Sequence, residues 1–255
     1  MRRNNVLKAR VVIVFLALIT LTLFSLEDNV LVADGDDDQC ESLSKLDNVD
    51  TEEAEVKQRI WEIIDRQANR EKRSDILTVT IDGTTFYVID YGDDEAFLLQ
   101  KESVEIDSFG ETNIWRDSNA RAYLNDSSEG GYLYDKDVLS KMLIEKELAT
   151  ASTYDRNSEF ITTKDKVFLP SEADMLRTVD GNGWSIDDRE FTQSRSMVLS
   201  QNVRSNGTDY VLRSPAHDEN SLAGVLLDGT IGCGKCDTPC MIRPAMWVDI
   251  SVRSN

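Results

Sequence analysis

The segment 76–91 constrains the fold most strongly, because apolar and polar residues alternate along it on either side of an Asp82-Gly83 pair. β-Branched and aromatic residues flank this pair, and Asp-Gly favours the tight turn of an antiparallel hairpin. A further turn at 92–94 leads into another apolar run. We therefore predict a three-stranded antiparallel meander over residues 76–106.

Residues 51–73, which precede this sheet, have apolar residues at the spacing of an α-helix. These residues recur at spacings typical of one helix face, at Val56, Ile60, Ile63, Ile64 and Ala68. Acidic residues stand at the start of the segment and basic residues at its end, which suits the helix dipole. We predict an amphipathic helix that docks on the following domain. A helix that contacts a partner is the alternative.

The first 33 residues predict export. Four basic residues lie within positions 1–10, and an uncharged apolar run follows at 11–24. This order is typical of a secretory signal peptide, and the run is shorter than the roughly 20 residues of a membrane-spanning helix. We expect either cleavage after Ala33 or an uncleaved signal-anchor, which would be the chain's one route to a membrane. In both cases the protein is secreted or at the cell surface.

The charge balance excludes two classes of partner. The 255 residues carry a net charge of −19, and because residues 1–33 hold four cations and two acids, the remainder carries −21. Nucleic acid and anionic lipid both require a cationic surface. We interpret residues 34–50 as an acidic, solvated linker. Residues 74–255 show no repeat or internal linker, so we predict a single α+β domain there.

Short elements are expected to fill this domain. The predicted helices cover 115–125, capped by Asp117 or Ser118, and 133–148. A third, short helix is predicted to begin after Ser171, which would be its cap. The predicted strands cover 166–170, 210–214, 223–231 and 245–252, with a turn at Asp228-Gly229.

Several phrases of the domain occur together in a known family. They are Trp115-x-x-Ser118-x-x-Arg121-x-x-Leu124-Asn125, Val167-Phe168-Leu169-Pro170-Ser171-x-x-Asp174, Leu212-Arg213-Ser214-Pro215, Asp228-Gly229 and Arg243-Pro244-Ala245-Met246-Trp247-Val248. Their order over residues 75–252 resembles an uncharacterised bacterial domain of unknown function, found in secreted and surface proteins. That family is distantly similar to the C-type-lectin-like and formylglycine-generating-enzyme folds. The resemblance implies a C-type-lectin-like fold and carries over no catalytic residue.

We interpret the motif residues of this family as structural. They are Trp115, Arg121, Asn125, Arg213, Ser214, Arg243, Pro244 and Trp247. A buried arginine needs a carboxylate or backbone carbonyls, and Glu172 or Asp174 could supply the carboxylate. The alternative is that the three arginines converge on an anion site.

Four cysteines, Cys40, Cys233, Cys236 and Cys240, are the candidates for covalent chemistry. In an exported protein an even number indicates two disulfides, with Cys40 tying the N-terminal segment to the C-terminal region and the pairing undetermined. One alternative is a redox Cys-x-x-Cys at 233–236, where Lys235 would lower a thiol pKa. The other is a four-sulfur zinc site.

The sequence predicts no cofactor and leaves calcium, zinc and copper open. The segment from Asp180 to Asp188 has the polar character of a calcium loop, but it lacks the ligand positions of an EF-hand. The cysteine spacing does not match the copper-binding pair of the formylglycine-generating enzymes. We read His217, the one histidine, as a loop residue rather than an acid/base partner of Asp218.

These patterns together predict a non-catalytic extracellular domain that binds a glycan or a protein. One alternative is a metal- or thiol-dependent, oxidoreductase-like enzyme that uses Cys233, Cys236 and Cys240. Another is a structural module of an envelope assembly.

Overall fold

A computed structural model describes residues 37–68, 77–154, 158–176, 190 and 201–251, with side chains described from residue 48 onward except at 201–202. The predicted signal segment and the calcium-like loop from Asp180 to Asp188 lie outside the described residues. Within these ranges, no helix combines the length and the apolarity needed to cross a membrane. The structure mixes α and β, with mostly short strands and few helices, as predicted.

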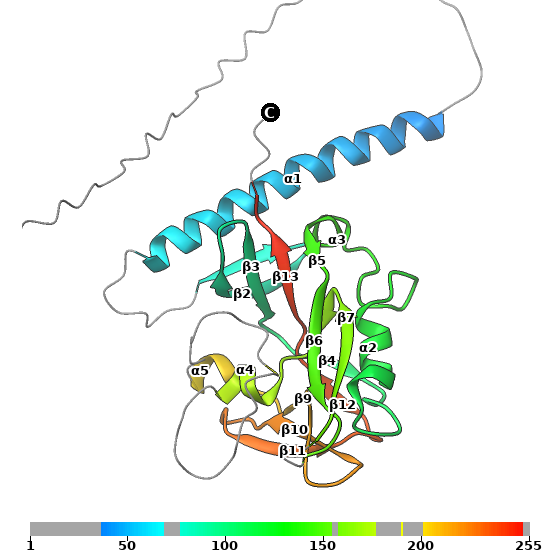
Figure 1. Ribbon diagram of the computed structural model, residues 1–255. Helices are drawn as coiled ribbons and strands as arrows, with labels where there is room; N and C mark the ends of the chain where they lie inside the picture. Colours follow the sequence, from blue (N-terminus) through cyan, green and yellow to red (C-terminus); the bar gives the residue numbers. More distant parts are fainter. Residues whose placement is uncertain (1–36, 69–76, 155–157, 177–189, 191–200, 252–255) are drawn as a thin grey trace, which may run out of the picture.

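Two sheets form the body of the molecule (Figure 1). The first has the order β1-β2-β3-β13-β5, with β8 also paired to β13. Its strands are β1 (Thr78–Ile81), β2 (Thr84–Tyr91), β3 (Glu95–Gln100), β5 (Leu143–Ile144), β8 (Val167–Phe168) and β13 (Ala245–Asp249). The second has the order β11-β10-β9-β12-β4. Its strands are β4 (Val104–Ile106), β9 (Tyr210–Pro215), β10 (Ser221–Val225), β11 (Ile231–Lys235) and β12 (Cys240–Ile242).

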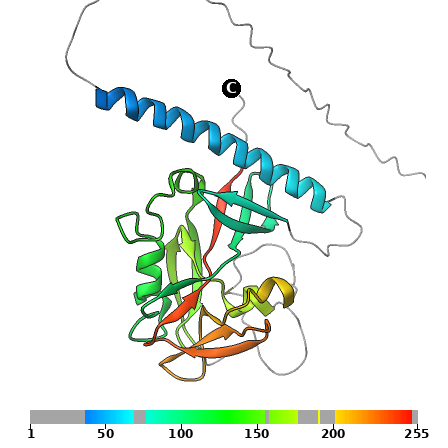
Figure 2. The same ribbon diagram turned by 180° about the vertical axis from the view of Figure 1, so that it is seen from behind.

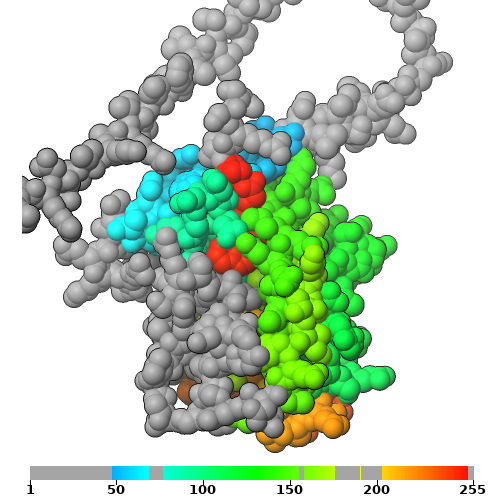
Figure 3. Space-filling view, in the orientation of Figure 1, coloured from blue at the N-terminus to red at the C-terminus, as the bar shows by residue number. Residues whose placement is uncertain are grey.

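The remaining elements surround these sheets. A separate hairpin pairs β6 (Lys146–Ala151) with β7 (Phe160–Asp165). The short helices are η1 (Trp115–Asp117), α2 (Asn119–Leu124), α3 (Asp137–Met142), α4 (Glu172–Leu176) and α5 (Gln201–Arg204). The long helix α1 (Asp37–Ala68) crosses the end of the molecule opposite to the second sheet, as the view from behind also shows (Figure 2). In the space-filling view, green residues run along one side between these two ends (Figure 3).

The Asp82-Gly83 turn confirms the predicted hairpin. Both residues have positive φ angles, 45° and 73°, as a tight two-residue turn requires. The Asp82 carboxylate also accepts a hydrogen bond of 2.8 Å from the backbone N–H of Leu139, at the start of α3. The turn that closes β1 onto β2 therefore also caps a helix more than fifty residues later in the chain.

Helix α1 is longer than predicted. It begins at Asp37, so most of the segment read as a linker, 34–50, is helical, and the predicted end at 69–73 lies outside the described residues. Two features of the sequence explain the extension. Acids near residue 37 suit a helix N-terminus, and Leu43, Leu46 and Val49 continue an apolar spacing of three.

The apolar face of α1 docks on its own domain, as predicted. Ile60, Ile63 and Ile64 are buried, and the helix contacts β1, β2 and α3. The Trp61 indole N–H donates to the Ile250 carbonyl at 2.9 Å, and Lys57 Nζ donates to Asp249 Oδ2 at 3.0 Å. The helix thereby holds the end of β13 and is part of the folded unit.

Three element predictions were wrong, two because a long-range pairing overrides the local pattern and one because a turn divides the predicted strand. The helix over 133–148 ends at Met142, since the next residues form β5 against β13 and β6 against β7. The third meander strand ends at Gln100, and β4 pairs with β12 in the other sheet. The strand over 223–231 is a hairpin, because the Asp228-Gly229 turn returns the chain from β10 to β11.

We expect the Ile60→Ala variant to unfold more readily, because it leaves a cavity between α1 and the first sheet. Its free energy of unfolding should fall by about 2–4 kcal/mol, measured by urea denaturation. The control is Glu62→Ala, at an exposed position of the same helix, which should change the free energy of unfolding little. Equal, small effects of both variants would show that α1 does not contribute to the core.

Candidate functional site

Trp115 and Arg121, two of the family-motif residues, converge on one buried carboxylate. The Trp115 indole N–H donates to Asp165 Oδ2 at 3.0 Å, and Arg121 Nε donates to Asp165 Oδ1 at 2.6 Å. The Thr163 hydroxyl completes the set at 2.6 Å. Since Asp165 is buried and fully engaged by these donors, the cluster fixes α2 against β7 and leaves no group free for a ligand.

Asn125 joins α2 to β8. Its Nδ2 donates to the Val167 carbonyl at 2.8 Å, and its Oδ1 accepts from the backbone N–H groups of Lys166 and Val167 at 3.0 and 3.2 Å. Ser118 accepts from the Arg121 N–H as the N-cap of α2, as predicted. These contacts are structural.

Arg213 is fully buried, and its guanidinium donates to two backbone carbonyls and one side-chain hydroxyl. It donates to the Ala149 carbonyl at 2.9 Å and to the Thr150 hydroxyl at 2.6 Å, and it also reaches the Glu190 carbonyl. The predicted carboxylate of Asp174 lies 3.9 Å away. The neighbouring Ser214 donates to Glu190 Oε2 at 2.7 Å.

Arg243 is also fully buried, and carbonyl oxygens and aromatic rings surround it. Its Nε donates to the Gln100 carbonyl at 2.7 Å and its Nη1 to the Val203 carbonyl at 2.6 Å. The rings of Tyr87 and Tyr210 each lie 5.5 Å from the guanidinium carbon, a cation–π arrangement.

The last two motif residues lie beside Arg243 and along β13. The Pro244 carbonyl accepts from the N–H of Gln100 at 2.9 Å, and Trp247 packs against Phe97 with ring centroids 5.4 Å apart. Among the described residues, Arg121, Arg213 and Arg243 share no hydrogen-bond partner. The structure therefore does not bring the three guanidinium groups to a common anion site.

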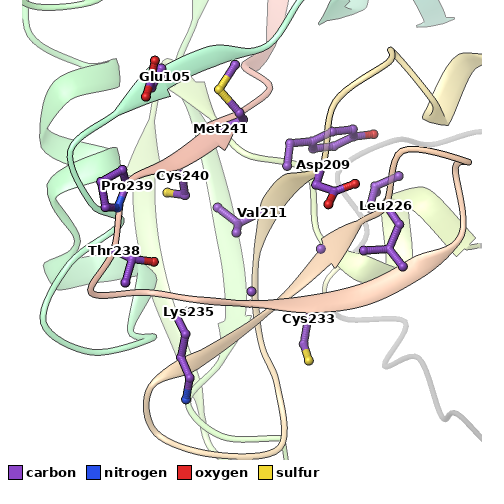
Figure 4. A pocket seen from close by; sticks show the side chains of 14 residues that line it. Glu105, Asp209, Val211, Leu226, Cys233, Lys235, Thr238, Pro239, Cys240 and Met241 are labelled. Carbon is purple, nitrogen blue, oxygen red and sulfur yellow. The ribbon is translucent and has the colours of Figure 1, made fainter.

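A groove crosses the second sheet (Figure 4). It has a volume of about 330 Å³, and its walls come from β4, β9, β10, β11 and the segment 238–241. Figure 4 shows Val211 and Cys240 near its middle, Thr238 and Pro239 towards one end, and Leu226 towards the other.

Two glycines, Gly224 and Gly234, line the groove at points where other atoms of the chain approach their backbone closely. A Cβ atom at Gly224 would lie 3.0 Å from the Tyr210 carbonyl oxygen, and one at Gly234 would lie 3.0 Å from Val211 Cγ1. Any side chain at these positions would displace its neighbours. The sequence signals, Gly232-x-Gly234 and Gly224 within strands, mark close approach of other groups to the backbone.

The rim of the groove is acidic and apolar. Asp209 and Glu105 contribute carboxylates, and Lys235 and Thr238 contribute other polar groups. Leu226 and the adjacent Leu227 are 38% and 58% exposed, and they are two of the few large apolar side chains exposed among the described residues. Sequence reasoning missed this site, because its walls come from strands more than a hundred residues apart.

A second cavity, of about 260 Å³, lies beside the hairpin formed by β10 and β11. Tyr154, Glu172, His217 and Cys233 line it, together with apolar residues such as Ile231. Burial, and then the charge of Glu190, raise the pKa of the Glu172 carboxyl. The His217 imidazole lies 3.2 Å from Asp218 and is well exposed, as a loop histidine would be.

The three cysteines of the second sheet have free thiols, so the predicted disulfides are not present there. Cys40 lies in the first turn of α1, and the start of α1 is at the opposite end of the molecule from β11 and β12 (Figure 1, Figure 2). A disulfide or a shared zinc site between Cys40 and the other three does not fit this arrangement. The described part of the chain contains no group of three or more His, Cys, Asp or Glu side chains arranged to hold a metal ion.

Burial raises the thiol pKa values of Cys236 and Cys240. For Cys236 the charge of Asp237 adds to the effect of burial, and for Cys240 the pKa rises to about 11. The cation that was expected to lower a thiol pKa, Lys235, does act in that direction on Cys236, but the effects of burial and of Asp237 outweigh it. Neither thiol is therefore activated in the way that a catalytic cysteine requires.

Comparison with protein families gives one match. The model of a family described as a domain of unknown function (DUF6273) matches residues 93–250, more than half of the chain. No curated protein and no solved structure matches. The predicted resemblance to an uncharacterised domain is thereby confirmed.

We expect the Asp165→Ala variant to destabilise the protein strongly, because the Arg121 guanidinium and the Trp115 indole would lose their shared acceptor. The free energy of unfolding, measured in urea, should fall by about 3 kcal/mol or more. The matched control is Asp117→Ala, which removes an exposed ion pair with Arg116 and should behave like the parent protein. A similar, small effect of both changes would contradict the structural role of the cluster.

We also expect the thiols to react with iodoacetamide in a fixed order, Cys233 first. Cys233 is exposed, whereas burial keeps Cys236 and Cys240 as thiols at neutral pH. Because the thiolate is the reactive form, alkylation of Cys240 should quicken about tenfold for each pH unit as the pH rises towards about 11. Mass spectrometry of the modified peptides measures the order. Labelling of Cys240 as fast as that of Cys233 would contradict it.

Proposed function

The chain belongs to the DUF6273 family of domains of unknown function, and from the groove of the second sheet we propose that it is a non-catalytic domain that binds another protein. The groove accommodates an extended segment of the partner. The observation that carries this proposal is the groove itself, lined by two glycines and bordered by an acidic and an apolar rim.

The shape of the groove favours a main chain over a compact ligand. Gly224 and Gly234 line the groove with main chain and no side chain, which suits a partner backbone that lies along β10 and β11. The two ends of the groove carry different side chains, Pro239 and Thr238 against Leu226 and Asp209. Such differences at the two ends give an extended segment a preferred direction.

The chemistry of the rim favours a protein over a glycan. A sugar ring usually stacks on an exposed aromatic face, and the one aromatic residue that lines the groove, Tyr210, is buried and donates its hydroxyl to the Arg204 carbonyl. The exposed Leu226 and Leu227 bind apolar side chains instead. The carboxylates of Asp209 and Glu105, on a chain with a net charge of −19, select a segment that also carries lysine or arginine.

Location and fold relationship are part of the same proposal. We place the domain outside the cytoplasm on the basic and apolar pattern of residues 1–33, and in a bacterium on the resemblance of its motifs to a bacterial family. The likeness to C-type-lectin-like folds rests on the phrase from Arg243 to Val248, whose last four residues lie in strand β13 of the first sheet.

The proposal predicts that short peptides with apolar and basic residues bind, and that a side chain at position 234 prevents this. A peptide selected from a library against the parent protein should lose at least tenfold in affinity for Gly234→Val, about 1.4 kcal/mol. Glu105→Gln should weaken binding less and reduce its dependence on salt, because it removes one carboxylate from the rim. Titration calorimetry measures both.

Thr80→Val, on β1 in the other sheet, is the control and should bind like the parent. Circular dichroism checks that each variant is folded. Selection of acidic peptides, or binding that is unaffected by Gly234→Val in a folded protein, would refute a protein ligand in the groove. Oligosaccharides that bind in its place would show that the ligand is a glycan.

A further inference from the structure

Cys233, in strand β11, and Cys236, directly after that strand, lie on opposite faces of the second sheet. Side chains alternate along a strand, and here Cys233 and Lys235 are exposed whereas Cys236 is fully buried. The ladder continues through Cys236, because its N–H donates to the Asn220 carbonyl at 3.0 Å. The Cys-x-x-Cys spacing therefore directs the two thiols apart.

Cys240 lies on the same face as Cys236. A Cβ atom at Gly234 would touch Val211, so Gly234 and Cys236, two positions apart, face the side on which Val211 lies. Val211 is the partner of Ile242 in the register of β9 with β12, and Cys240 is two positions before Ile242. Cys236 belongs to the buried core, and Cys240 packs against that core.

One short segment holds both of these cysteines. The backbone N–H of Gly110 donates to the Cys236 carbonyl at 3.1 Å, and the backbone N–H of Phe109 bonds to the Cys240 sulfur. Two consecutive amides thus hold the two ends of the 236–240 turn. A disulfide needs Cα atoms within about 7 Å and Cβ atoms that point towards each other, and the 236–240 turn is short enough in sequence to bring two residues into that range.

We propose that Cys236 and Cys240 form a disulfide when the protein meets a disulfide oxidant, and that Cys233 takes no part in that bond. Cys240 lines the groove and is partly exposed, so its thiolate attacks first. It forms a mixed disulfide with one half of the oxidant and releases the other half as a thiol. Buried Cys236 then attacks the Cys240 sulfur and releases the second thiol. Each cysteine loses one proton and one electron, and the oxidant is reduced to two thiols.

The bond is a staple rather than a catalytic centre. Burial raises the pKa of both thiols, so exchange is slow at neutral pH, unlike in enzymes that turn over disulfides. The closed turn contains Thr238 and Pro239, which form one end of the groove. Oxidation therefore fixes that end in place whatever the groove binds, and the inference does not depend on the proposed ligand.

Peptide mapping tests the pairing directly. Trypsin cleaves after Lys235 and not before Pro244, so one peptide, 236–253, contains both Cys236 and Cys240, and another contains Cys233. The full chain is incubated with oxidised glutathione, the remaining thiols are alkylated, and the digest is analysed without reduction. We expect peptide 236–253 to be two hydrogens lighter and unlabelled, and Cys233 to carry an alkyl or glutathione group.

Two variants separate the steps. Cys236→Ser removes the resolving thiol, so glutathione should remain attached to Cys240, and Cys233→Ser should leave the bond intact. A cross-link between the peptides of Cys233 and 236–253, a link to Cys40, or two labelled thiols in 236–253 after oxidation would overturn the proposal. Because the test uses the parent chain, it does not depend on the folding of either variant.

Discussion

The two sheets are held together at the buried guanidinium of Arg243, which lies where the chain passes from β12 to β13. It donates to the Gln100 carbonyl at the end of β3 in the first sheet, and the hydroxyl of Tyr210 in the second lies 3.3 Å from its Nη1. Among the described residues, no carboxylate contacts the Arg243 guanidinium. Carbonyl dipoles and the rings of Tyr87 and Tyr210 therefore offset the cost of burying its charge. Such a site is specific for arginine, because lysine has neither the planar fork nor the number of donors.

This junction explains why the second sheet can hold a groove. β3 and β4 are consecutive in sequence and lie in different sheets, as do β12 and β13, so the second sheet is connected to the first at both crossings. The first sheet packs against α1 through β1 and β2, and it supplies more of the core than the second sheet does. The second sheet therefore leaves part of its surface, lined by Gly224 and Gly234, open to a ligand.

The sequence predicted what local chemistry determines. The Asp82-Gly83 turn, the Ser118 cap and the docked face of α1 were all readable from residue type and spacing. The strands β5 to β7 were not, because residues 143–151 carry a pattern compatible with a helix and become strands only through pairing with β13 and β7. The groove was missed for the same reason, since Glu105 meets Met241 only once β4 pairs with β12.

The cysteines show that thiols close in sequence need not lie close in space, because side chains alternate between the two faces of a strand. Cys233 and Cys236 are three positions apart, and a redox motif was one interpretation of that spacing, but an extended strand turns one thiol to solvent and the other into the core. Cys236 and Cys240 are farther apart in sequence, and a turn held by two neighbouring amides brings them to one face. Exposure of Cys233 thus follows from the same alternation that buries Cys236. The hairpin can offer a free thiol on one side while a bonded pair closes the other, because the sheet itself stands between them.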